Sequence, residues 1–153
     1  MHWHHVPGFQ QPEKPDTEAL KRWVREARLL AAESDRGEIG DLIIGRMLAY
    51  APNDTNDGAW PHRAIRDVIE DVGSEDLESG MRSEQMNKRG AHWRAVTEGG
   101  AQERDLAAEA EGWASVVGPR WPRTESLLRR VSDMWDREAK REDEEAAKRK
   151  LDF

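Results

Sequence analysis

The chain has 153 residues, the size of a single domain with one core, and its 31 acidic and 24 basic residues give a net charge of −7. That charge disfavours nucleic acid as a partner, because an acidic protein repels phosphate backbones. The sequence contains no cysteine, which excludes disulfides, thiolate nucleophiles and zinc sites built on sulfur. It also lacks a run of about 20 apolar residues and the regions of a secretory signal, so we expect a cytoplasmic protein with no membrane partner.

Residues 1–15 hold three prolines and no hydrophobic period, which predicts an extended, flexible leader. His2, His4 and His5 could chelate a transition metal, since neutral imidazoles are good ligands. A flexible leader gives them no fixed geometry, and an expression remnant would explain them equally well. A position near the end of the chain is therefore the simpler explanation of these histidines.

Two amphipathic helices are expected next. Asp16 is a carboxylate cap where free backbone N–H groups need acceptors, and apolar residues then recur at three- and four-residue steps as far as Ser34. The pattern restarts at Ile39 and closes at Ala51-Pro52, because the residue before proline disfavours helical geometry. The apolar stripes consist of Leu20, Trp23, Val24, Ala27, Leu30 and Ala31 in the first helix and Ile39, Leu42, Ile43, Met47 and Leu48 in the second.

The middle of the chain is less regular. Residues 53–58 form a polar turn cluster, and Trp60-Pro61 places proline at the first position of a third helix, which ends at Gly73. Residues 74–90 contain few large apolar side chains and predict a weakly determined helix and loop. Residues 91–97 are compatible with a short strand or a turn, which would leave the fold class unchanged.

Two more helices complete the predicted fold. A fourth carries Leu106, Trp113 and Val117, and a last one begins around residues 122–124. All but three of the fifteen residues at 136–150 are charged, which indicates a solvated helical end that can fray. We therefore expect an all-α fold: about five helices in an irregular bundle with a Trp-rich core, comprising a helical domain at residues 16–138 and a charged tail at residues 139–153.

Carboxylates at three- and four-residue steps suggest one enzymatic alternative. Two such pairs on facing helices could hold Mg²⁺ or Mn²⁺ and support a metal-dependent phosphohydrolase or nucleotide pyrophosphatase. Against this, 36% of the chain is charged, so such pairs also arise by chance beside Lys or Arg. The candidate ligands are Asp67, Glu70, Asp71, Glu138 and Glu142.

The polar segment from Asn53 to Arg66 offers two further readings. Asn53–Gly58 superficially resembles a calcium loop, but the twelfth position, where such a loop needs a bidentate Glu, is Ala64. His62 lies close in sequence to Arg63 and Arg66 and could help to bind an anion or shuttle a proton. A self-stabilised turn and a surface histidine at a helix start are the simpler alternatives.

Several of the seven tryptophans have no apolar stripe to join and are candidates for a partner-facing surface. Arg120 and Arg123 flank one of these, Trp121, in a mixture of guanidinium and aromatic groups that is also found on nucleic-acid surfaces. An ordinary rim of arginines over a buried tryptophan is the alternative. The predicted partner-binding residues are Trp93, Trp121, Arg120 and Arg123.

The segment DRGEIGDLIIGRMLAYAPNDTNDGAWPHRAIRDVIED (residues 35–71), together with Glu98-Gly99-Gly100 and Gln102-Glu103-Arg104, resembles the C-terminal regions of large uncharacterised bacterial proteins. The resemblance covers residues 17–150 and implies a unit that accompanies other domains. It brings no activity, substrate or catalytic residue.

The sequence favours a helical protein-interaction or regulatory module of a bacterial cytoplasmic system over an enzyme. A protein partner is expected, a homo-oligomer is compatible with the pattern, and no cofactor is predicted. The metal-dependent phosphohydrolase remains the alternative.

Overall fold

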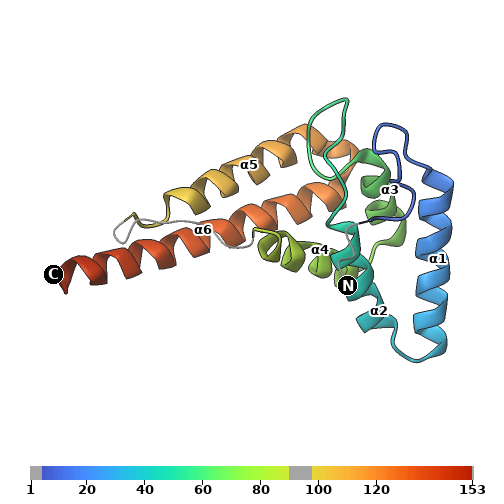
Figure 1. Ribbon diagram of the computed structural model, residues 1–153, viewed down its shortest axis with the longest axis horizontal. Coiled ribbons are helices and arrows are strands. Elements are labelled where there is room, and N and C mark those ends of the chain that lie inside the picture. Colours follow the sequence, from blue (N-terminus) through green and yellow to red (C-terminus); the bar gives the residue numbers. More distant parts are fainter. Residues whose placement is uncertain (1–4, 90–97, 153) are drawn as a thin grey trace.

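The computed structural model describes residues 5–89 and 98–152, and helices take up 73% of these residues, with no strand among them. The all-α class is therefore confirmed (Figure 1). In chain order the elements are α1 (Thr17–Glu33), α2 (Gly37–Leu48), α3 (Arg63–Val72), α4 (Glu75–Asn87), α5 (Ala101–Val117), the 3₁₀ turn η1 (Gly118–Arg120) and α6 (Pro122–Leu151).

Side-chain caps define several helix starts. Asp16 accepts a hydrogen bond from the Ala19 N–H at 3.0 Å and is the N-cap of α1, and Ser34 is its C-cap, so both predicted boundaries of this helix are confirmed. Ser74 caps α4 in the same way through the Leu77 N–H. The predicted start of α3 is wrong, because Pro61 precedes the helix in a cis peptide and His62 is the capping residue.

The described chain contains six α-helices, not about five, because α4 is a regular helix where a weakly determined segment was expected. It has few large apolar side chains because glycines bring its backbone against α2. A Cβ on Gly80 would collide with the backbone of Leu42, and a Cβ on Gly45 would collide with that of Leu77. Leu77 and Met81 fill the core below this crossing.

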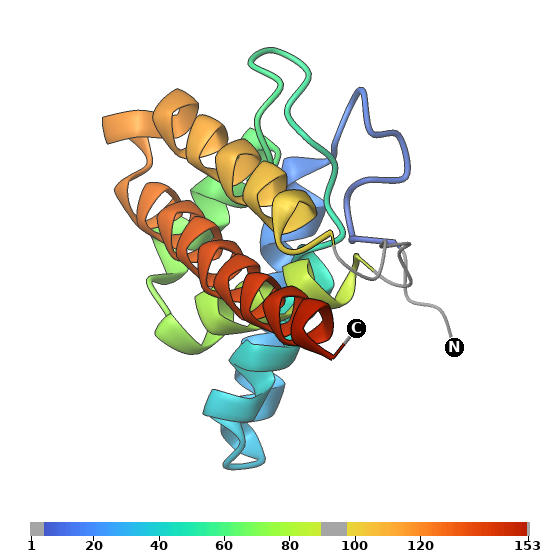
Figure 2. The same cartoon turned by 90° about the vertical axis from the view of Figure 1, so that its left-hand side faces the viewer.

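Two helical hairpins form the ends of the molecule. Helices α5 and α6 run side by side in both views, and α3 and α4 pack against α6 (Figures 1 and 2). Helix α2 packs against both α1 and α4, and the α1–α2 hairpin extends beyond the body in Figure 2. One side of this hairpin is therefore exposed to solvent.

The leader predicted to be flexible at residues 1–15 is partly packed. Val6 and Phe9 are buried in the main core, and the Phe9 ring meets His62 edge-on with centroids 5.2 Å apart. The expectation of a loose leader is therefore wrong for this stretch. Among the tryptophans, Trp60, Trp121 and Trp135 are buried, and Trp23 and Trp113 pack partly buried against the core.

The predicted boundary between residues 138 and 139 coincides with no break, because α6 continues from Pro122 to Leu151. Ala139 is buried against the start of α5, where a Cβ on Gly100 would collide with its backbone. Asp143 accepts a hydrogen bond from the Gly100 N–H at 2.8 Å and pairs with Arg104. The first part of the predicted tail is thus packed against α5.

Candidate functional site

Asp54 organises the loop between α2 and α3. Its buried carboxylate accepts hydrogen bonds from Arg63 Nε at 3.0 Å and Nη2 at 2.9 Å, and from the Asn56 and Asp57 N–H groups. The side-chain hydrogen bonds from Arg63, assisted by the Asp57 and Arg63 backbone N–H groups, outweigh burial and hold the pKa of Asp54 far below its usual range. Asp54 is therefore ionised and fully engaged in the loop.

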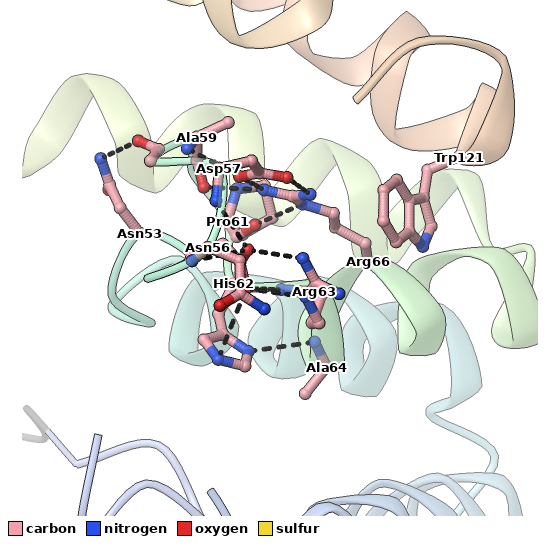
Figure 3. Close-up of polar contacts among 12 residues, drawn as sticks. Asn53, Asn56, Asp57, Ala59, Pro61, His62, Arg63, Ala64, Arg66 and Trp121 are labelled. Atoms are coloured by element: carbon pink, nitrogen blue, oxygen red, sulfur yellow. Dashed lines mark hydrogen bonds and ion pairs between the residues drawn. The ribbon is translucent and has the colours of Figure 1, made fainter. Parts of the chain in front are cut away.

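Arg66 is completely buried and joins the same loop to the core (Figure 3). Its guanidinium donates to both oxygens of Asp57, at 2.7 and 2.9 Å, and to the carbonyl oxygens of Pro61 and Ala59. It also lies over the Trp121 ring, 4.8 Å from the centroid. These contacts provide the compensation that a buried arginine requires.

His62 is buried, so the expectation of a surface histidine is wrong. Its Nδ1 accepts a hydrogen bond from the Ala64 N–H at 3.1 Å, which places the proton of the neutral ring on Nε2, 3.7 Å from Asp54. Burial is the main cause that lowers the pKa of His62, although Asp54 opposes it. The imidazole serves as a neutral helix cap.

This network is arranged to hold the loop in shape. Asp54 is paired with Arg63 and Asp57 with Arg66, so an arginine side chain already neutralises each carboxylate. Within residues 5–89 and 98–152, no three His, Cys, Asp or Glu side chains come together in a group that could hold a metal ion. The structure thus agrees with a self-stabilised turn at residues 53–58.

The carboxylates predicted as metal ligands serve other purposes. Glu70 accepts hydrogen bonds from the Arg123 and Thr124 N–H groups and caps α6. Asp67 accepts from Trp121 Nε1 at 2.9 Å, and Asp71 is exposed. Glu138 and Glu142 both contact Arg141, about 20 Å along α6 from the end that meets Glu70. The five residues do not converge, so the predicted metal site is wrong.

The predicted partner-binding residues that the structure describes do not form an open binding surface. Trp121 is only 6% exposed, so its predicted place on an open surface is wrong, and Arg120 covers its ring at 4.5 Å. Arg123 pairs with Glu78, whose pKa is raised by burial in spite of that bond. The arrangement matches the alternative of an arginine rim over a buried tryptophan. Trp93 lies outside the described residues.

A cluster of exposed apolar side chains lies on the α1–α2 hairpin. Leu30, Ile39 and Ile43 have exposed fractions of 65%, 59% and 50%. Helical periodicity places these three side chains on one side of the seam between α1 and α2, next to the half-buried Trp23. We call Leu30, Ile39 and Ile43 the hairpin face.

A shallow groove of about 450 Å³ lies on the opposite side of the same hairpin. Its apolar lining comes from Val24, Leu29, Ala32 and Val72. The charges beside it are partly neutralised, because Arg28 holds Asp41 through two hydrogen bonds of 2.9 and 3.2 Å. The hairpin thus has a mixed apolar and charged groove on one side and the apolar hairpin face on the other.

Leu30, Ile39 and Ile43 belong to apolar stripes that were expected to face the core, so the hairpin face was not predicted. Glycines supplied a signal. Gly40 meets Ala31 of α1 and Gly45 meets Leu77 of α4, so glycines occupy the faces of α2 that pack. Because glycines occupy the packed faces of α2, some of its large apolar residues must lie on a face that no helix covers.

Searches against protein-family models, curated proteins and solved structures find no match to the chain. Among the described residues, no helix has the length and apolar character required to cross a bilayer.

Proposed function

We propose that this protein is a helical protein-interaction module and that it binds through the hairpin face. The observation that carries the proposal is the exposure of Leu30, Ile39 and Ile43 by half or more of their surface on one side of a projecting hairpin. Exposed apolar side chains that cluster on one face are candidates for a protein-interaction surface. We also propose an accessory or regulatory role in a bacterial cytoplasmic system, as expected from the sequence.

The alternative, a metal-dependent phosphohydrolase, has less support. It requires carboxylates from α3 and α6 to share one ion, but Glu70 caps α6 while Glu138 lies farther along that helix beside Arg141. Each of these carboxylates has a structural partner that explains its position. An interaction module is therefore the function that the geometry supports best.

Photo-crosslinking in cells of the source organism tests the proposal. A photoreactive phenylalanine analogue at Leu30 or Ile43 should form discrete protein adducts on irradiation. Val116 is the matched control, because it is 50% exposed on α5 and, among the described residues, no other large apolar side chain of that helix is exposed. Adducts of equal yield from Val116, or none from the hairpin positions, would contradict an interaction surface at the hairpin face.

A further inference from the structure

We propose that the partner on the hairpin face is a second copy of this chain, related by a two-fold axis that runs parallel to α1 and α2. This inference rests on the proposed function and names its partner. It follows from the register of the two helices and from the charges along their edges.

The register is set where Gly40 of α2 meets Ala31 of α1. Because the helices are antiparallel with the same rise per residue, Leu30 lies level with residue 41, midway between Ile39 and Ile43. A rotation about an axis along the seam places α1 over α2 of the second copy at the same level. Each Leu30 then enters the gap between Ile39 and Ile43 of the other copy, as a knob enters a hole.

Charged side chains line both edges of the hairpin face. Glu26 and Glu33 are exposed along α1, where Arg22 is also exposed, and Arg36 is exposed beside Asp35 at the start of α2. Arg46 lies farther along α2, and its side chain is 51% exposed beside Glu84. In the register above, Glu26 is next to the level of Arg46, and Glu33 lies within about one helical turn of Arg36.

This charge pattern favours a second copy over a foreign partner of one sign. A uniformly acidic segment would meet like charge along α1, and a uniformly basic segment would meet like charge along α2. A copy of the same hairpin places Glu26 near Arg46 and Glu33 near Arg36 on both edges, which is the self-complementarity that a two-fold interface requires.

The size of the face indicates a weak dimer. Leu30, Ile39 and Ile43 together expose about 200 Å² of apolar surface, given that a whole buried side chain of this type removes about 100 Å² from water. Stable interfaces bury about 800 Å² per partner, more than half of it apolar. The dimer should therefore form and dissociate with concentration.

Sedimentation velocity of the full chain over a wide concentration range tests the assembly. The average mass should rise from 17.5 kDa toward twice that value. Leu30→Glu should raise the dissociation constant at least tenfold, whereas the control Val116→Glu should leave it unchanged, with both variants checked for folding by circular dichroism. A wild-type chain that stays monomeric throughout would overturn the proposal.

A charge exchange tests the edges. Glu33→Arg and Arg36→Glu should each weaken the dimer several-fold, because each places like charges together across the axis. The double variant should recover most of the lost affinity, since both pairs form again with their signs reversed. Additive losses in the double variant would overturn the proposed register.

The absence of cysteine allows the register to be tested directly. Chains carrying Leu30→Cys, mixed with chains carrying Ile43→Cys, should form a disulfide-linked heterodimer on oxidation faster than Leu30→Cys mixed with Val116→Cys. Equal rates would overturn the two-fold arrangement. If photo-crosslinking from Leu30 instead captures a different protein while the purified chain stays monomeric, the interaction module stands and self-association fails.

Discussion

Arg66 shows how a single charged residue connects the loop before α3 to the core. Its guanidinium is completely buried and contacts Asp57, two backbone carbonyls and the Trp121 ring. Removing one partner of a buried ion pair leaves an uncompensated charge, which costs more than the pair itself contributes.

Arg66→Met should lower the free energy of unfolding by about 3–5 kcal/mol, measured by urea denaturation. The matched control is Arg120→Met, because Arg120 contacts the same Trp121 ring from the exposed side. Its loss should cost less than about 1 kcal/mol. Similar costs for the two variants would show that Asp57 and the carbonyls contribute little.

His62 should make stability depend on pH. Burial lowers its pKa in the folded chain below the ordinary 6.5, so the unfolded chain binds the proton more readily as pH falls. The free energy of unfolding should decrease as pH falls from about 6.5 to the folded-state pKa, and show no contribution from this residue above 6.5. Protonation would also remove the acceptor for the Ala64 N–H.

His62→Asn separates the two roles of this residue, because asparagine is a good helix cap that does not titrate. Thermal unfolding measured between pH 7.5 and 5 should show a flatter pH dependence in the variant than in the wild type. An unchanged slope would mean that other groups cause the pH dependence.

At the scale of elements, the crossing of α2 and α4 depends on glycine. Gly80→Ala should cost about 1–3 kcal/mol of stability, since the new Cβ would collide with the Leu42 backbone. Gly112→Ala is the control: this site in α5 has open space around it, and alanine should stabilise the helix by about 0.5–1 kcal/mol. Opposite signs in chemical denaturation are expected, and a gain at both sites would contradict close backbone packing.

Elements that depend on local signals could be predicted from the sequence, whereas those that depend on distant contacts could not. The α1 boundaries were predictable because Asp16 and the apolar period give local signals. Helix α4 was underestimated because its packing depends on contact between Gly80 and a residue 38 positions earlier, which no local pattern reveals. His62 could not be recognised as the α3 cap because proline at the first helical position is the commoner pattern.

The candidate site was harder to predict than the fold, because exposure is a property of the whole molecule. Leu30 and Leu20 belong to the same predicted stripe, yet Leu20 is buried and Leu30 is 65% exposed, since the hairpin extends beyond the body. Trp121 shows the reverse: it has no stripe but is buried, because Arg66 and Asp67 hold it from α3. Periodicity predicts which residues share a face, but it does not predict what covers that face.

The packing of the charged end of α6 can be tested on the whole chain. Ending the chain after Glu138 removes Ala139 and the Asp143 carboxylate that caps the start of α5. The melting temperature should fall by about 3–6 °C, equivalent to about 1–2 kcal/mol, whereas ending it after Lys150 should change little. An unchanged melting temperature in the shorter chain would support an independent tail at residues 139–153.

Helix α6 is a single element of 30 residues, about 45 Å long, that contacts α3, α4 and α5. Leu127, Val131 and Trp135 are buried in the shared core, so amide hydrogens around them should exchange with solvent only when the whole fold opens. Amides near Leu151, beyond the buried Ala146, should exchange through local fraying. One continuous helix should therefore show global protection at one end and nearly free exchange at the other.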